Sequence, residues 1–225
     1  MERERVNRPS FDDMRQTMID CQLRTTGVSD PRVVAAFAAV PRERFVPADR
    51  ANLAYVDEDL AVGPGRYLME PMAFGQLLMG ARLRGDERVL IIGAATGYAS
   101  AVIARLAGEV VAVEEDSALA MTARANLADL GVANATIVEG PLAKGWGESA
   151  PYDLLFFDGA VEHVPPALLA QLKDGGRIVG VIVDDTGVQH AATSVVVGWS
   201  FGFDEFTDIS VRPLPGFERP KRFAF

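Results

Sequence analysis

The sequence is poor in residues that bind metals or form crosslinks. Its 225 residues include one cysteine, Cys21, and two histidines, His163 and His190. A single cysteine excludes an intramolecular disulfide and a zinc site built from cysteine ligands. No apolar run approaches the roughly 20 residues that span a bilayer, and the charged start MERERVNRPS is unlike a secretory signal. We therefore expect a cytoplasmic protein without a membrane partner.

Positive charge is also scarce. Lys and Arg total 22 against 31 Asp and Glu, so the formal net charge is −9. Without a basic excess to displace phosphate counterions, we do not expect a nucleic-acid partner. Hydrophobic residues make up 49% and charged residues 24%, a composition typical of a folded globular chain. A chain of this length buries about 70% of its unfolded surface and needs no metal or disulfide to fold.

We expect residues 1–84 to form a helical N-terminal extension with a loop that covers a pocket. Ser10 and Asp30 are helix caps, Gly27 ends the first helix and Pro31 starts the second. A third helix begins near Pro71, and residues 41–70 between them predict irregular structure. Residues 1–9 predict disorder. The first helix has an apolar face that we expect to be buried, made of Met14, Met18 and Cys21.

Residues 85–225 predict an α/β core, and with the extension they predict one compact domain. Short apolar runs at 88–92, 110–114, 136–139, 153–158 and 177–183 predict strands, and the segments 97–107, 116–130 and 165–173 predict helices. Buried strands separated by helices indicate a parallel sheet covered on both faces. Two more β-like stretches, 193–199 and 206–211, predict an antiparallel hairpin at the sheet edge. We expect the C-terminal tail, residues 213–225, to pack back on the protein surface through Phe223 and Phe225.

The turn between the first core strand and its helix has the features of a ligand site. Residues 93–97 read Gly-Ala-Ala-Thr-Gly, and their small side chains allow a ligand to approach the backbone. Free N–H groups at the helix start would favour polar or anionic groups. Glu114, at the end of the next strand, could accept hydrogen bonds from both hydroxyls of a ribose. The alternative is a packing turn with a surface glutamate.

Tyr98 favours one class of ligand over another. A dinucleotide-binding turn needs a small residue there for close packing of helix on strand, and tyrosine is large. S-adenosylmethionine (SAM) has no pyrophosphate and tolerates that bulk. The turn therefore favours a methyltransferase over a dehydrogenase.

Motifs along residues 20–185 resemble those of the protein-L-isoaspartate O-methyltransferases, a SAM-dependent family. They are Gln22-Leu23-Arg24, the segment VPRERFV at 40–46, Gly63-Pro64-Gly65, Pro71-Met72, the turn from Gly93 to Tyr98, Glu114 and Pro151-Tyr152-Asp153. The VPRERFV segment is the most specific of them. The resemblance implies a Rossmann-like methyltransferase fold, mostly parallel, in a protein-repair enzyme that transfers methyl from SAM to the carboxylate of isoaspartyl residues in damaged proteins.

The resemblance also implies site residues. The cofactor would be held by Gly93, Ala95, Gly97, Glu114 and Leu142. The substrate would be bordered by Tyr67, Met69 and Asp158, which form the catalytic side, and no metal ligand is implied. A carboxylate is already a nucleophile at neutral pH, so catalysis would consist mainly of positioning it.

The sequence departs from the family at several of these positions. Where the family usually has a Thr-Ile-Ser run, the chain has Tyr67-Leu68-Met69, followed by Glu70, and Ile91 replaces an acidic residue. Gly140-Pro141-Leu142 replaces a Gly-Asp-Gly motif. Alternatives therefore stay open: a degenerate relative that binds SAM or a partner without isoaspartyl activity, or a methyltransferase of another substrate.

The second of these alternatives includes a metal-dependent O-methyltransferase. Asp158 ends one strand, and Asp184 and Asp185 follow the next. Acids in this arrangement resemble the cation site of catechol-type O-methyltransferases, where the metal lowers the pKa of a hydroxyl substrate.

Overall fold

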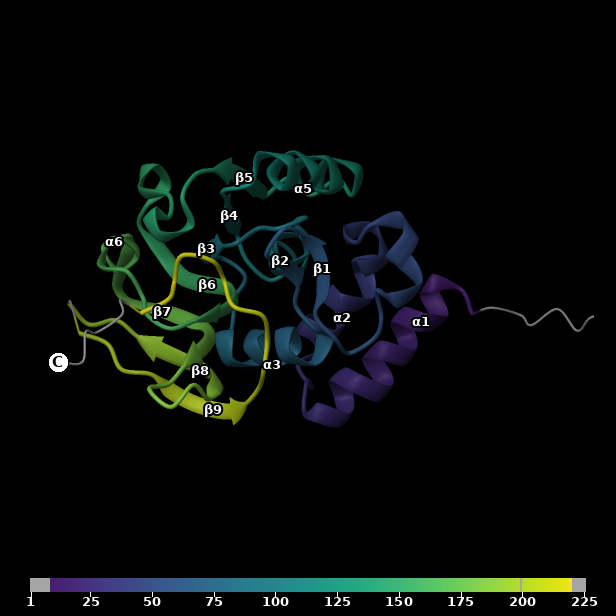
Figure 1. Cartoon of the computed structure of the whole chain (residues 1–225), viewed down its shortest axis with the longest axis horizontal. Helices are drawn as coiled ribbons and strands as arrows, with labels where there is room; N and C mark the ends of the chain where they lie inside the picture. Colours follow the sequence, from purple (N-terminus) through teal and green to yellow (C-terminus); the bar gives the residue numbers. More distant parts are fainter. Residues whose placement is uncertain (1–8, 199, 220–225) are drawn as a thin grey trace, which may run out of the picture.

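The core is a seven-stranded sheet in a computed structural model that describes residues 9–198 and 200–219 (Figure 1). The strand order is β5-β4-β3-β6-β7-β8-β9, with β3 to β7 parallel, β8 antiparallel to β7 and β9 antiparallel to β8. The strands are β3 (Arg88–Ile92), β4 (Glu109–Glu114), β5 (Ala135–Glu139), β6 (Tyr152–Val161), β7 (Leu172–Val183), β8 (Gln189–Val195) and β9 (Asp204–Asp208). The mostly parallel sheet with an antiparallel edge is confirmed.

The register brings three strand ends together. Ile92 of β3 pairs with Val113 of β4 on one side and with Phe157 of β6 on the other. The residues that follow these pairs are Gly93, Glu114 and Asp158. They leave the sheet at the same carboxyl edge, where open parallel sheets bind ligands.

Successive strand residues point to opposite faces of the sheet, and both faces are buried. In β3, Val89 and Ile91 join the hydrophobic cluster formed by the larger helices, and Leu90 and Ile92 join the cluster on the other face. The first cluster also includes N-terminal residues such as Met18 and Phe37 of the extension, so extension and sheet share one core.

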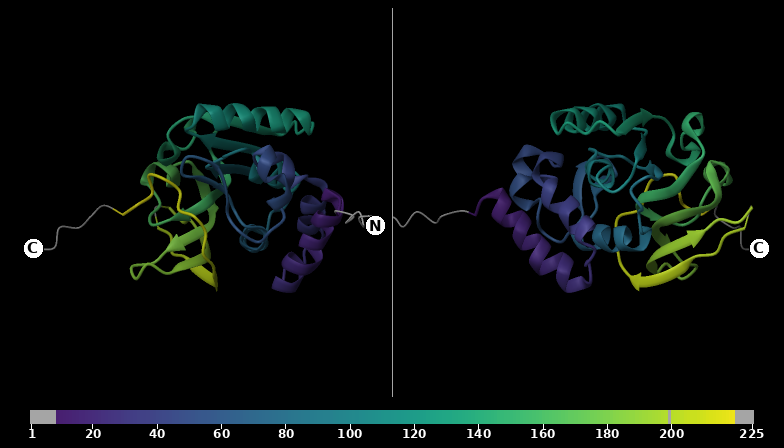
Figure 2. Two further views of the ribbon diagram at one scale, coloured as in Figure 1. Left: turned by 45° about the vertical axis from the view of Figure 1, so that its right-hand side comes forward. Right: turned by 180° about the vertical axis from the view of Figure 1, so that it is seen from behind.

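The first two helices begin where the sequence predicts caps, and Figure 2 shows the helices from two further directions. They are α1 (Phe11–Met18), α2 (Pro31–Ala39), α3 (Pro71–Ala81), α4 (Tyr98–Ile103), α5 (Ser117–Asp129) and α6 (Pro166–Leu169). Ser10 and Asp13 form a capping box at α1, and Asp30 accepts a hydrogen bond from the Arg32 N–H at α2. None of the helices in the described part of the chain is long and apolar enough to cross a membrane.

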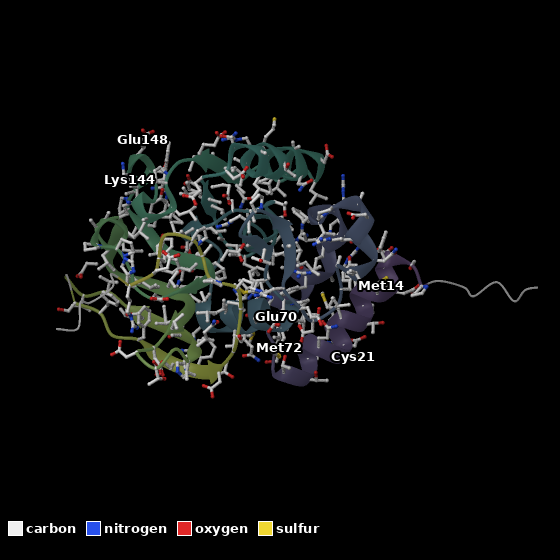
Figure 3. All side chains as sticks on the ribbon, in the orientation of Figure 1. Met14, Cys21, Glu70, Met72, Lys144 and Glu148 are labelled. Carbon is white, nitrogen blue, oxygen red and sulfur yellow. The ribbon has the colours of Figure 1, made fainter. Side chains whose placement is uncertain are left out.

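The prediction for the face of the first helix was wrong at Cys21. After α1 the chain continues as a π-helical turn, Ile19–Leu23, which rotates the later residues relative to α-helical spacing. Met18, Ile19 and Leu23 are therefore buried, while Cys21 is exposed. Figure 3 shows Cys21 at the outer surface of this helical segment.

Other predicted boundaries also needed correction. The segment 41–70 contains 3-10 turns and a hairpin of β1 (Leu60–Gly63) and β2 (Arg66–Leu68). The predicted helix 165–173 is only α6, because the chain turns into β7 at Leu172 through an irregular register around Gly175, whose φ is 76°. The edge strands β8 and β9 lie a few residues earlier than predicted. The predictions for 1–8, Trp199, Phe223 and Phe225 lie outside the described residues.

Candidate functional site

The turn after β3 adopts backbone conformations that favour small residues. Gly93 and Gly97 have φ of 92° and 93°, and Ala95 has φ of 47°, a left-handed value that is strained for alanine. The Gly93 and Ala94 N–H groups both donate to the Val113 carbonyl, and the Gly97 N–H donates to the Ala94 carbonyl. The N–H groups of Gly93, Ala94 and Gly97 are therefore bonded within the protein, whereas the expectation of free N–H groups concerned the start of the helix at Tyr98.

Glu114 is fully buried at the end of β4, directly beside this turn. Its carboxylate accepts hydrogen bonds from the N–H groups of Ala95 at 2.7 Å, Glu115 at 3.1 Å and Asp116 at 3.2 Å. One of its oxygens also lies 3.1 Å from Nη2 of Arg66, which comes from β2. Glu114 lies beside the turn, as predicted, but the sequence gave no sign that an arginine of the same chain would pair with it.

Two side chains occupy the space above Gly93. A Cβ atom on Gly93 would lie 2.6 Å from Nη2 of Arg66 and 2.8 Å from Cδ2 of Leu214. Leu214 belongs to the C-terminal segment, defined here as residues 211–217, which crosses the carboxyl edge of the sheet (Figure 1). Both obstacles are the ends of side chains rather than backbone.

The C-terminal segment is fixed to β6. The Ala160 N–H donates to the Arg212 carbonyl at 3.0 Å, and the Leu214 N–H donates to the Ala160 carbonyl at 2.8 Å. Phe217 is buried with its ring centroid 5.4 Å from that of Phe157. The C-terminal segment is therefore held in place and covers the ends of the strands. Its position could not be predicted from the sequence, because the segment has neither the periodicity of a strand nor the signals of a helix.

The residues fit a nucleoside cofactor once Arg66 and Leu214 withdraw. The glycine turn supplies a surface without side chains, and the buried Glu114 supplies acceptor oxygens of the kind that bind ribose hydroxyls. Nε and Nη1 of Arg66 are buried without hydrogen-bond partners, so the present occupant of this space is poorly satisfied. Leu142 lies with its side chain in the adjacent hydrophobic cluster, where its contact with a cofactor would be apolar.

The predicted substrate-side residues Tyr67, Met69 and Asp158 do lie together. They line a cavity of about 10 Å³, the space of roughly one water molecule, along with Asp59, Gly159 and residues of the C-terminal segment. Arg66 lines the same cavity, so the candidate cofactor and substrate sides are continuous.

Asp158 is a buried carboxyl at the end of β6. Burial raises its pKa to about 7, and the neighbouring carboxylates of Asp59 and Glu114 act in the same direction. The guanidinium groups of Arg66 and Arg42 oppose this rise but do not cancel it. Asp158 therefore changes charge near neutral pH.

Arg42, from the VPRERFV segment, holds the substrate side in place. Its buried guanidinium donates to the Met69 carbonyl at 2.7 Å and to the Ala54 carbonyl at 2.6 Å, and it lies 4.9 Å from the ring centre of Tyr98. Sequence reasoning used this segment as a motif without a role for Arg42. No signal in the sequence distinguished Arg42 from Glu43 and Arg44, the other charged residues of this segment.

Asp59 connects the parts that surround the cavity. Its carboxylate accepts from the N–H groups of Glu70 at 2.8 Å and Arg212 at 2.6 Å. It therefore joins the start of α3 to the C-terminal segment. Sequence reasoning missed Asp59, since no motif surrounds it.

Glu70 does not line the cavity that Asp158 lines, but a neighbouring surface groove that shares Asp59 and Arg212 with that cavity. Partial burial raises the pKa of Glu70 to about 7, helped by the charges of Asp57 and Asp59. Glu70 is therefore not among the residues that surround Asp158 in the cavity.

The acids of the metal hypothesis do not assemble. Asp184 accepts hydrogen bonds from the N–H groups of Thr186 and Val188 in its own turn, and exposed Asp185 pairs with Arg219. Across residues 9–198 and 200–219, no group of three or more His, Cys, Asp and Glu side chains could hold a metal ion.

Comparisons with known proteins agree on one family. A family model described as protein-L-isoaspartate(D-aspartate) O-methyltransferase matches residues 14–195. A protein-L-isoaspartate O-methyltransferase of Anaeromyxobacter dehalogenans is 45% identical over 191 residues, which cover 84% of this chain and 90% of the relative. Protein-L-isoaspartate O-methyltransferase 1 of Rhodopseudomonas palustris strain HaA2 is 41% identical over 181 residues, 80% of this chain and 74% of the relative.

Solved structures give the same result for the fold. A protein-L-isoaspartate O-methyltransferase structure has a TM-score of 0.78 at 28% identity and covers 90% of this chain and 66% of its own. The structure of a protein from Plasmodium falciparum, described as a putative enzyme of this kind in complex with S-adenosyl-L-homocysteine, has a TM-score of 0.75. At 16% identity, with 92% of this chain and 99% of that chain covered, it supports the fold alone.

Proposed function

Because the chain belongs to the protein-L-isoaspartate(D-aspartate) O-methyltransferase family, we propose that it methylates the carboxylate of isoaspartyl residues in damaged proteins at the edge where Gly93, Glu114 and Asp158 meet. The chain is a SAM-dependent O-methyltransferase, as its family assignment implies. What the family does not supply is the role of each residue in this particular site.

On the cofactor side, Gly93, Ala95 and Gly97 would form the surface against which SAM lies, and Glu114 would accept hydrogen bonds from its ribose. SAM, when bound, would supply a methyl group that passes from the sulfonium sulfur to a carboxylate oxygen, with S-adenosylhomocysteine as the leaving group. Glu114 is held by three backbone N–H groups, so its orientation is fixed before any ligand arrives. Such preorganisation lowers the entropy lost on binding.

On the substrate side, the main task of the protein is to hold the acceptor carboxylate in line with the methyl group. Arg42 fixes the backbone of Met69, and Asp59 fixes the start of α3 and the C-terminal segment. Met69 adds an apolar side chain to the cavity wall. These contacts would hold the walls of the substrate site rigid while the acceptor is positioned.

Asp158 would control how well the cavity accepts an anion. While it is protonated, below a pH of about 7, it adds no repulsion and its O–H can donate to the acceptor carboxylate. Above that pH its negative charge opposes the acceptor. The buried position of Asp158 beside Tyr67 and Met69 is the observation that carries this role.

The test is methyl transfer from SAM to a synthetic peptide that contains isoaspartate, beside the same peptide with normal aspartate. We expect methylation of the isoaspartyl peptide only, with the rate falling as the pH rises through about 7, and with Asp158→Asn removing that fall. A chain that binds S-adenosylhomocysteine (SAH) but methylates neither peptide would support the degenerate relative instead, a possibility that Met69 in place of a hydroxyl residue favours.

A further inference from the structure

Arg66 is a buried cation whose hydrogen bonding is incomplete. Its side chain is 4% exposed, and Glu114 is its ion-pair partner at 3.1 Å. Nε and Nη1 are buried with no hydrogen-bond partner. A buried N–H group without a partner costs about 1–3 kcal/mol, so this arrangement leaves the arginine able to gain from a further anionic partner.

The guanidinium lies at the boundary between the two halves of the site. On one side, its Nη2 and Nη1 would be 2.6 and 3.2 Å from a Cβ on Gly93, so it covers the glycine turn. On the other side, Arg66 lines the cavity that contains Tyr67, Met69 and Asp158. A change of side-chain rotamer would move the charged end from the first place to the second.

Arg66 and a ribose cannot bind the Glu114 carboxylate at the same time. Oε1 of Glu114 accepts from the N–H groups of Glu115 and Asp116, and Oε2 accepts from the Ala95 N–H and lies against Arg66. A nucleoside that hydrogen-bonds to Glu114 must displace the guanidinium. The two therefore compete for one carboxylate.

Two other arginines lie near the cavity, and neither is released when a nucleoside takes Glu114. Arg42 donates to the carbonyls of Met69 and Ala54, with its Nη1 left without a partner, and Arg212 lines the cavity with its guanidinium 5.3 Å from the centre of the Tyr67 ring. Met69 offers no donor. A planar guanidinium matches a carboxylate with paired N–H groups, which makes arginine well suited to orient one.

Resting on the function proposed above, we propose that Arg66 serves two carboxylates in turn: Glu114 in the free protein, and the carboxylate of the methyl acceptor after a nucleoside has taken its place on Glu114. Arg66 is thus both the group that closes the cofactor cleft and the residue that binds the acceptor. The cofactor binds before the acceptor, because the Arg66 guanidinium is released to hold the acceptor only after it has left Glu114.

Calorimetry of SAH with the full chain tests the first half of the proposal without turnover. Arg66→Met removes the competitor, so we expect it to bind SAH roughly tenfold more tightly than the wild type. Arg88→Met is the matched control, since Arg88 pairs with Glu109 at the opposite end of β3 and should leave SAH affinity unchanged. Equal or weaker SAH binding by Arg66→Met would overturn the competition.

The second half is tested with an isoaspartyl peptide at saturating SAH. The wild type should bind the peptide only when SAH is present, and Arg66→Met should bind it roughly tenfold more weakly. Arg66→Lys retains a positive charge beside buried Glu114 and so protects the fold, yet lacks the planar donor pair, and it should show the same loss. Unchanged peptide affinity in both variants would overturn the role of Arg66 as the acceptor site.

Failure of this proposal differs from failure of the proposed function. If the wild type methylates the isoaspartyl peptide and Arg66→Lys does so with an unchanged KM, Arg66 is not the acceptor residue and the function stands. If the wild type methylates no isoaspartyl peptide, the function fails and the acceptor role of Arg66 fails with it, whatever SAH binding shows.

Discussion

Replacing Asp158 by asparagine should change how the stability of the protein depends on pH. Asparagine has the shape of the protonated aspartate but cannot ionise. In the folded protein the pKa of Asp158 is raised to about 7 by burial, against an ordinary value of 3.8. The folded state therefore keeps this proton to a higher pH than the unfolded state, and the wild type loses stability as the pH rises from about 4 to 7.

The size of the effect follows from the same two values. Their difference corresponds to about 4 kcal/mol in total, of which about 2.5 kcal/mol is lost between pH 5 and 8. The free energy of unfolding of Asp158→Asn, relative to the wild type, should therefore rise by about that amount between pH 5 and 8. Urea unfolding followed by circular dichroism at each pH gives both values, and other titrating groups cancel in the comparison.

Asp153 provides a matched control in the same strand. Although partial burial opposes it, hydrogen bonds from the Arg88 N–H and from Lys173 lower the pKa of Asp153. It is therefore ionised in both states above pH 5, and Asp153→Asn should shift stability by the same amount at pH 5 and pH 8. Parallel pH dependences for the wild type and Asp158→Asn would refute the assignment of a raised pKa to Asp158.

Three further substitutions test the turn and its acid. Gly93→Ala should lower the free energy of unfolding by about 2–4 kcal/mol, because the new Cβ meets backbone strain and collides with Arg66. Gly85 has a similar φ but lies in open space, so Gly85→Ala should lower the free energy of unfolding by only about 1–2 kcal/mol. Equal decreases for the two variants in urea unfolding would contradict this reasoning. Glu114→Gln should weaken SAH binding about tenfold or more in calorimetry, and unchanged affinity would remove Glu114 from the site. Ala95→Gly should raise stability by about 1 kcal/mol through relief of its left-handed strain, and a lower melting temperature would count against that reasoning.

The sheet could be predicted well because its strands are short apolar segments with clear boundaries. Arg88–Ile92 matched residue for residue, and Glu114 and Asp158 emerged at one edge as expected. The turn that contains Gly93, Ala95 and Gly97 was identifiable as a turn because a run of small residues separates an apolar strand from a helix. These features depend on local patterns, which a single sequence displays.

The parts that were missed depend on contacts between distant segments. Arg66 and Glu114 are 48 positions apart, and nothing near either residue shows that they pair. Leu214 covers Gly93 from the C-terminal segment, whose position is set by hydrogen bonds to Ala160. Cys21 was misplaced because a π-helical turn shifted the helix face, which periodicity alone does not reveal.

A crystal structure of the full chain with bound SAH tests most directly whether Glu114 and the glycine turn hold the cofactor. We expect ribose hydroxyls within hydrogen-bond distance of Glu114, the nucleoside lying over Gly93, and the Arg66 guanidinium turned toward Tyr67 and Asp158. A structure in which SAH binds elsewhere while Arg66 stays paired with Glu114 would contradict this expectation.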